Sequence, residues 1–332
     1  MAVVLFSPGS LPWTMSEDTE KTGSPADPDR WRHEAARING VDLHYVTVPP
    51  DPDAVDHPTG AAPLVVLLHG FPSFWYAWRG QLDALADAGY RVIAPDMRGY
   101  NRSSAPPGVD SYRPGELVGD VRGLIEHRGA PQATVVGHDW GGLVAWETAI
   151  REPDVVDRLA VLNAPHPAAY EQRVLQSPTQ LLRSWYVAAF QLPWVPERLL
   201  SAGNYALLER GFEGTATPDA FTPADIERYR AAMDRTDSLS GPINYYRAMA
   251  RETIEEGVES LLPWEDERDR TVEAPTLVLW GEQDPALEAG LADGLERWVP
   301  DVRVRRFPEA SHWVHLDASE RVTDELRSFL TQ

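Results

Sequence analysis

The sequence predicts an α/β fold in which a mostly parallel sheet is interrupted by a block of helices. Short β-rich runs without polar alternation are separated by amphipathic helical segments, which is typical of a parallel sheet buried on both faces. Residues 166–265 lack a strong strand signal, and the alternation returns after them. We therefore expect an α/β core of residues 31–165 and 266–332 and a helical cap of residues 166–265.

The expected elements follow in order along the chain. Asn39-Gly40 supplies the tight turn of a hairpin over residues 37–48. Strands are predicted at 64–68, 90–94, 133–137 and 159–163, with helices near 78–88, 114–128 and 141–150 between them. After the helical block we expect a strand at 276–280, a helix at 287–298, a strand at 302–306 and a helix at 318–330.

Composition excludes several classes of protein. The 332 residues include no cysteine, which rules out disulfide scaffolds, thiolate metal sites and cysteine nucleophiles. The longest apolar runs, such as residues 63–68, are too short to cross a bilayer. The net charge of −21 repels nucleic acid and anionic lipid, so we expect neither nucleic acid nor membrane as a partner. A cytoplasmic location is expected, and no oligomeric state is predicted.

The acidity and the N-terminus each suggest a hypothesis. Lys21 is the single lysine among 30 basic residues, and many carboxylates with so little lysine resemble proteins of salt-accumulating halophiles. A GC-rich genome explains the arginine preference but explains the net charge less well. Residues 1–30 are expected to be a disordered extension, with Met15 as the true start, because residues 16–29 are polar and no secretion signal precedes them.

Asp139 stands at the centre of the strongest motif, Gly137-His138-Asp139-Trp140-Gly141-Gly142, between a predicted strand and a predicted helix. This is the layout of a nucleophile elbow, in which small neighbours permit a sharp turn that lifts the central side chain above the sheet. An aspartate that caps a helix, with glycines for packing, is the alternative. A carboxylate that attacks an sp³ carbon forms an ester that water can cleave. Asp139 therefore predicts a substrate such as an epoxide or an alkyl halide.

The ester-hydrolysis step needs a base and donors for an oxyanion. His312 follows the predicted strand 302–306, and Asp284 follows the predicted strand 276–280, so the order nucleophile, acid, histidine suits this kind of sheet. The backbone N–H groups of Phe71 and Trp140 are the expected oxyanion donors, each worth about 3–4 kcal/mol.

These residues resemble the epoxide hydrolases of the α/β-hydrolase superfamily. The resemblance runs from about Trp31 to Leu330 and rests on five motifs: His69-Gly70-Phe71-Pro72 with Trp78-Arg79, Asp96-Met97-Arg98-Gly99-Tyr100, Gly137–Gly142, Asn163-Ala164-Pro165-His166-Pro167, and Ser311-His312-Trp313. It implies the α/β-hydrolase fold, with a mostly parallel eight-stranded sheet and an inserted helical cap. It implies no metal or other cofactor.

The resemblance also points to two tyrosines in the cap. Similar family members hydrogen-bond the epoxide oxygen with one tyrosine before a Phe-Gln-x-Pro segment, here Tyr186, and one in a Gly-Pro-x-Asn-x-Tyr-Arg segment, here Tyr246 with Tyr245 beside it. Ring opening makes an alkoxide, and a phenol is a suitable proton donor for it. The function implied is opening of a small apolar epoxide, with water, to a vicinal diol through an alkyl-aspartyl ester. Packing of the cap core is the alternative role for both tyrosines.

Two other functions stay open. A haloalkane dehalogenase would use the same Asp139–His312–Asp284 triad, but Phe71 stands where its second halide donor would be. A catalytically silent binding protein of the same fold is less favoured, because every triad residue is present. We expect four tryptophans to line a site for an apolar or aryl substrate: Trp75, Trp140, Trp185 and Trp313.

Overall fold

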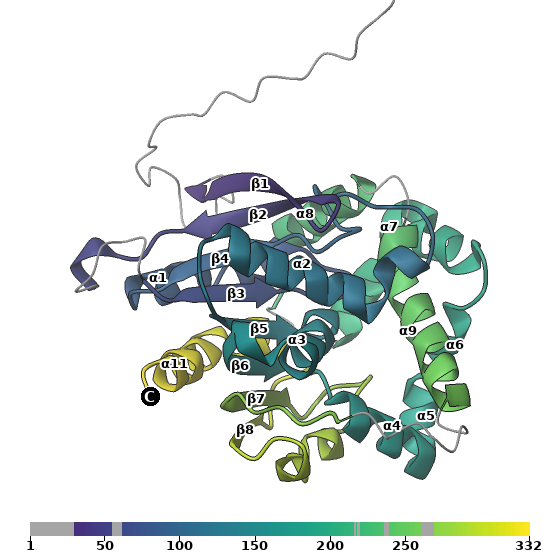
Figure 1. Cartoon of the computed structure of the whole chain (residues 1–332). Coiled ribbons are helices and arrows are strands. Elements are labelled where there is room, and N and C mark those ends of the chain that lie inside the picture. The colour runs from purple at the N-terminus through teal and green to yellow at the C-terminus, as the bar shows by residue number, and fades with distance from the viewer. Residues whose placement is uncertain (1–29, 55–61, 216, 218–219, 236–238, 260–268) are drawn as a thin grey trace, which may run out of the picture.

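The computed structural model describes residues 30–54, 62–215, 217, 220–235, 239–259 and 269–332, and Figure 1 shows the whole chain. The strands are β1 Arg32–Ile38, β2 Val41–Val48, β3 Leu64–Leu68, β4 Arg91–Pro95, β5 Ala133–His138, β6 Val156–Leu162, β7 Thr276–Gly281 and β8 Val302–Phe307. They form one sheet in the order β1-β2-β4-β3-β5-β6-β7-β8. The pairs β1–β2 and β2–β4 are antiparallel and the other pairs are parallel, so the mostly parallel eight-stranded sheet is confirmed.

Helices cover the parallel part of the sheet. The core helices are α1 Leu82–Asp87, α2 Pro114–His127, α3 Trp140–Arg151, α10 Val314–Asp317 and α11 Ser319–Leu330. α2 packs against α3, α1 packs against α11, and α3 contacts β3, β5 and β6. Every residue of β3 and of β5 is buried, which explains why these strands read as continuous apolar runs rather than alternating ones.

A helical insertion connects β6 to β7. Its helices are α4 Pro167–Gln176, α5 Pro178–Arg183, α6 Trp185–Ala189, α7 Val195–Thr215, α8 Pro223–Asp234 and α9 Ser240–Glu259. α8 begins with a capping box, because Thr222 and Asp225 each accept the other's backbone N–H. α7 is kinked at Ala202–Tyr205, where Gly203, Asn204 and Tyr205 have positive φ. In Figure 1 the insertion lies beyond the end of the sheet to which β3 points, so it faces the carboxyl ends of the parallel strands.

Most predicted elements agree with the structure, and the differences have local causes. The hairpin turn is confirmed, with φ of 46° at Asn39 and 78° at Gly40. The predicted helix at 287–298 is wrong: the chain forms two 3₁₀ turns, Ala289–Ala292 and Leu295–Arg297. Gly294 lies between them with φ of +65°, and a left-handed residue ends helical hydrogen bonding. The helix predicted near 78–88 is instead a 3₁₀ turn at Trp75–Trp78 followed by α1.

Parts of the predicted organisation lie outside the described residues. These are the N-terminal extension up to residue 29, the proposed start at Met15, and the boundary of the cap at residue 265. Among the residues that are described, no helix combines the length and the apolar character that crossing a bilayer requires.

Candidate active site

Asp139 occupies a sharp turn between β5 and α3. Its φ of 51° and ψ of −120° are unusual for a residue with a side chain, and such strain is common where a fold holds a reactive group. The turn needs glycine on both sides. A Cβ at Gly137 would lie 2.2 Å from the Gly141 carbonyl oxygen, and a Cβ at Gly141 would lie 2.2 Å from the Leu68 carbonyl oxygen. The Gly-x-Asp-x-Gly spacing is therefore a steric requirement of this turn.

His312 lies between two carboxylates. Its Nδ1 is 2.7 Å from Asp284 Oδ2, and its Nε2 is 3.5 Å from Asp139 Oδ2. The carboxylate of Asp284 is fixed in turn: it accepts the Asn163 side-chain amide at 2.8 Å and the backbone N–H groups of Ala286 and Leu287 at 2.8 and 3.0 Å. The structure thus brings together the three residues that the sequence selects, and it orients the imidazole with Nε2 toward Asp139.

Electrostatics give these three groups a defined charge. Burial lowers the pKa of His312, but the negative charges and hydrogen bonds of Asp284 and Asp139 outweigh burial and raise that pKa to about 10. Burial raises the pKa of Asp139 and of Asp284, yet interaction with His312 brings the pKa of both carboxyls below its ordinary value. At neutral pH the site therefore holds an imidazolium between two carboxylates.

The turn after β3 supplies one hydrogen bond to Asp139. The Phe71 N–H donates to Asp139 Oδ1 at 2.7 Å. His69 anchors this turn, because its Nε2 accepts the Met97 N–H at 3.0 Å while its Nδ1 lies 3.0 Å from the Gly70 carbonyl oxygen. Burial lowers the pKa of His69, which favours the neutral ring that this pair of bonds requires. Trp140, the other expected oxyanion donor, is the first residue of α3.

Tyr186 and Tyr246 come from the insertion and gather near Asp139. Their ring centroids are 5.9 Å apart, and the Tyr246 ring lies 4.7 Å from Trp140 and 5.5 Å from Phe71. Burial raises the pKa of both phenols well above 10, and the charge of Asp139 raises each further. Both hydroxyls therefore stay protonated at neutral pH. The neighbouring Tyr245 is turned away, since its hydroxyl donates to the Arg98 carbonyl at 2.8 Å.

The prediction that four tryptophans line the site is wrong for two of them. Trp185 is 69% exposed, because it stands on the side of α6 that faces solvent. Trp75 is buried elsewhere, among Trp31, His33 and Phe74, because the 3₁₀ turn directs it toward the start of β1.

The other two tryptophans lie beside the predicted residues. Trp313 is in ring contact with His312, and Trp140 with Tyr246. Two further rings lie here that were not predicted to line the site. They belong to Phe71 and Phe190, and they lie 5.5 and 4.8 Å from the ring of Tyr246.

Sequence reasoning also missed two residues that hold the site. Asn163 ties two strands together, because its amide donates to Asp284 and its side-chain oxygen accepts the Gly281 N–H at 2.8 Å. Its signal in the sequence is an asparagine at the end of an apolar strand and the start of the Asn163–Pro167 motif, and asparagine tolerates the positive φ of 41° that the structure shows there. Asp317 holds the loop of His312 by accepting the N–H and the hydroxyl of Ser311 at 2.7 and 2.5 Å. A carboxylate five residues after the histidine is too common a pattern to predict this role.

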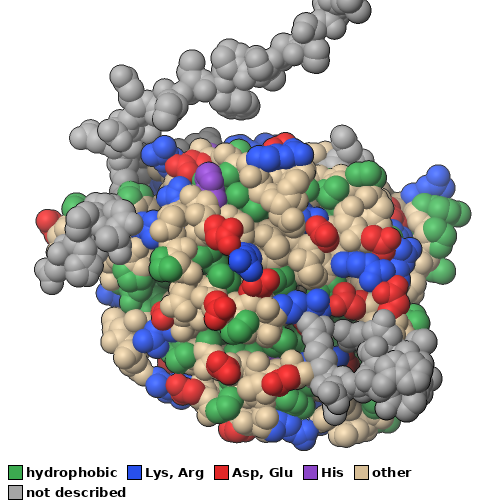
Figure 2. Space-filling model, viewed as in Figure 1, with side chains coloured by type: hydrophobic (Ala, Val, Ile, Leu, Met, Phe, Trp, Pro, Cys, Tyr) green, Lys and Arg blue, Asp and Glu red, His purple; other side chains and the backbone are tan. Residues whose placement is uncertain are grey.

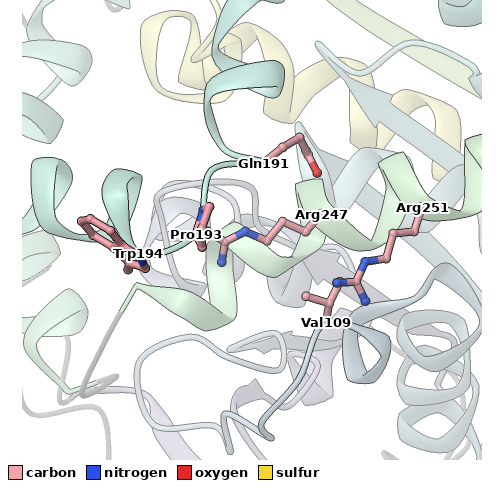
Figure 3. A pocket seen from close by; sticks show the side chains of 6 residues that line it. All are labelled: Val109, Gln191, Pro193, Trp194, Arg247 and Arg251. Carbon is pink, nitrogen blue, oxygen red and sulfur yellow. The ribbon is translucent and has the colours of Figure 1, made fainter.

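A hollow of about 350 Å³ opens at a different place, between the insertion and the core loop that contains Val109 (Figure 3). Val109, Gln191, Pro193, Trp194, Arg247 and Arg251 line it, and none of the residues proposed for chemistry does. Gln191 joins the hollow to the site, because its amide donates to the Tyr246 carbonyl at 3.3 Å. In the part of the chain that the structure describes, no three His, Asp or Glu side chains are grouped as metal ligands.

Comparison with known proteins gives a consistent answer. Residues 63–319 match the family described as the alpha/beta hydrolase fold. The AB hydrolase superfamily protein YfhM of Bacillus subtilis is 38% identical over 88% of this chain and 95% of its own length. Epoxide hydrolase 4 of Homo sapiens is 35% identical over 92% of this chain and 81% of its own length.

Solved structures agree with these relatives. A Bacillus megaterium epoxide hydrolase in complex with an inhibitor superposes with a TM-score of 0.79 at 30% identity, over 90% of this chain and all of that one. The chain therefore belongs to the α/β-hydrolase fold family, where it is a hydrolase related to these epoxide hydrolases.

Proposed function

We propose that the protein is an epoxide hydrolase that opens an apolar epoxide to a vicinal diol through an ester on Asp139. The observation that carries this proposal is the meeting of two sets of groups: a carboxylate 3.5 Å from an imidazole, and two protonated phenols beside that carboxylate. The first set can form and hydrolyse an alkyl ester, and the second can stabilise an alkoxide. The names of the relatives support the same reaction.

In the first step, Asp139 Oδ2 attacks a ring carbon while Oδ1 stays hydrogen-bonded to the Phe71 N–H. The carbon–oxygen bond of the ring breaks, and the oxygen takes a proton from Tyr186 or Tyr246 while the other hydroxyl donates a hydrogen bond to it. The aromatic rings of Phe71, Trp140 and Phe190 suit an apolar or aryl substituent. The helical insertion acts here as the cap that brings both phenols over the carboxylate.

In the second step, His312 becomes a base because the ester carries no charge. Loss of the Asp139 charge removes one of the interactions that raise the pKa of His312, so the imidazolium can release its proton and restore the tyrosine. Neutral His312 then takes a proton from water, and the hydroxide adds to the ester carbonyl carbon. The Phe71 and Trp140 N–H groups hold the oxyanion. The tetrahedral intermediate expels the alcohol oxygen, which takes the remaining water-derived proton, and Asp139 is again a carboxylate.

Turnover of styrene oxide beside 1-bromobutane, with Asp139→Ala as the control, tests this proposal. We expect phenylethanediol from the wild type and none from the variant. Bromide release without diol would favour the haloalkane dehalogenase, which lacks a use for the two tyrosines. If neither product forms and no adduct of Asp139 appears by intact mass, the silent binding protein is favoured instead.

A further inference from the structure

The large apolar side chains that the described residues expose are confined to one part of the molecule. All of them lie between Leu175 and Ile254, within the insertion. Seven fall in a single stretch of 25 residues, which we call the 175–199 surface: Leu175, Leu181, Leu182 and Trp185 on α4 to α6, and Leu192, Trp194 and Leu199 around the start of α7. Seven exposed apolar side chains within 25 consecutive residues are more than the singly scattered ones that any surface has.

The polarity of α5 is inverted, which argues that water is not its intended neighbour. Gln180 is fully buried, with its amide donating to the Ala286 carbonyl and its oxygen accepting the Glu288 N–H, both at 2.9 Å. The next two residues, Leu181 and Leu182, are 57% and 73% exposed. A helix with one face toward water would have the polar residue on that face and the leucines on the buried face.

The 175–199 surface also lacks the negative charge of the rest of the protein. It contains two arginines and one glutamate, in a chain with 51 acidic and 30 basic residues. The glutamate, Glu197, pairs with Arg247 at 2.6 Å, and Arg198 lies over the Trp194 ring at 4.8 Å. At the right rim of Figure 2, beside α7, apolar and basic side chains protrude together. The hollow in Figure 3 adjoins this surface, because Pro193 and Trp194 belong to both.

We propose that the 175–199 surface docks peripherally on a zwitterionic lipid membrane. Leucine and tryptophan flanked by arginine are the side chains that favour the interface between lipid and water. A second copy of the chain suits the surface less well, because two bodies of net charge −21 repel each other, whereas a zwitterionic bilayer carries no net charge. The proposal departs from the expectation that no membrane is a partner. That expectation rested on repulsion from anionic lipid and on the shortness of the apolar runs, and peripheral contact with a zwitterionic bilayer needs neither anionic lipid nor a spanning segment.

Docking would place the membrane next to the proposed site. Trp185 and Tyr186 are neighbours on α6: Trp185 is 69% exposed, whereas the Tyr186 ring contacts Tyr246. Apolar epoxides concentrate in lipid, so a surface that docks at α6 would draw substrate from that reservoir. The docking itself does not depend on the proposed reaction and is measured without turnover.

The test is co-sedimentation of the full chain with phosphatidylcholine vesicles, for the wild type and for the double variant Leu182→Gln/Trp185→Gln. We expect the wild type to sediment with lipid and the variant's partition coefficient to fall on the order of tenfold. The control is Leu207→Gln/Ile254→Gln, which also replaces two exposed apolar side chains by glutamine but outside the 175–199 surface, and it should stay within about twofold of the wild type. Melting temperatures establish whether each variant is folded. If the double variant does not fold, the single variant Leu182→Gln is used in its place.

Four results would overturn the proposal. Absence of wild-type binding would do so, as would an equal loss in the control. Binding that disappears in 1 M NaCl would show attraction between charges rather than apolar contact. A dimer in analytical ultracentrifugation that Leu182→Gln/Trp185→Gln dissociates would show that a second copy covers the surface.

Discussion

The core and the insertion hold their parts of the proposed site by different means. In the core, Asp284 accepts four hydrogen bonds, one of them from His312, and Asp139 receives the Phe71 N–H. In the insertion, Tyr186 and Tyr246 are held mainly by contacts between rings, to which Tyr246 adds a side-chain hydrogen bond with Trp140. Buried charge must be compensated by several fixed polar partners, whereas burying a neutral phenol costs less and needs fewer of them. The charged half of the chemistry is therefore the more rigidly built half.

Replacing the nucleophile is the strongest test of this comparison. Asp139→Ala should lower diol formation from styrene oxide on the order of 10⁴-fold or more, because no other carboxylate can form the ester. His312→Gln should instead form the ester and fail to hydrolyse it. Intact mass measured after mixing with substrate should show one added substrate on His312→Gln and none on Asp139→Ala. An adduct on Asp139→Ala would place the covalent chemistry elsewhere.

Breaking a buried ion pair in the core should lower the free energy of unfolding more than breaking an ion pair in the insertion. Arg98 and Asp120 form a nearly buried pair in the core, with contacts of 2.5 and 2.6 Å. Arg98→Met leaves a buried carboxylate without its cation and should lower the free energy of unfolding by about 3–5 kcal/mol. In the insertion, Arg230 pairs with Glu209 near solvent, so Arg230→Met should cost about 1 kcal/mol or less. Urea unfolding measures both, and equal losses would contradict the comparison.

The tyrosines should affect ring opening alone. Tyr186→Phe and Tyr246→Phe should each slow the formation of the ester by about 100-fold, the lower end of the effect of a general acid. The double variant should lose ring opening while its melting temperature stays close to that of the wild type. Rapid-quench measurement of the adduct gives the rate. Tyr205→Phe, a change of the same kind on α7, serves as the control and should leave that rate unchanged.

The smallest expected effect is the pH dependence of stability. The pKa of His312 is raised to about 10 in the folded protein, above the value of about 6.5 for an unfolded chain. The stability it contributes is therefore complete below about pH 6.5 and is lost as the pH rises through about 10. The difference in melting temperature between the wild type and His312→Gln should shrink by about a few degrees over that range. His127→Gln, the same change at an exposed histidine on α2, serves as the control.

Prediction from sequence succeeded where a pattern reports a local requirement. The turn at Asp139 needs small residues at fixed offsets, so Gly137 and Gly141 identify it directly. Parallel strands end at one edge of a sheet, which is why the sequence could place Asp284 and His312 close together. The mostly parallel sheet with a helical block follows from the same kind of pattern, and the α/β-hydrolase fold was implied by the resemblance to that superfamily.

Prediction failed where tertiary contacts decide the outcome. The sequence shows that Trp75 and Trp185 are aromatic but not which way a 3₁₀ turn or a short helix directs them. Asn163 and Asp317 act through partners that are distant in sequence or unremarkable in spacing. The helix expected at 287–298 failed because Gly294 takes a left-handed conformation that apolar periodicity does not reveal.

The proposed site is closed by contacts between distant parts of the chain. The Phe71 N–H reaches Asp139 across 68 positions, and His138 Nε2 lies 2.9 Å from the His312 carbonyl oxygen across 174. Contacts of such separation carry a large loop-closure entropy and form late in folding. Covalent capture of an epoxide by Asp139 and its release through His312 would therefore occur only in molecules whose last strand has joined the sheet. The rate of turnover measured during refolding would report the fraction of molecules that are fully folded, independently of how much secondary structure has already formed.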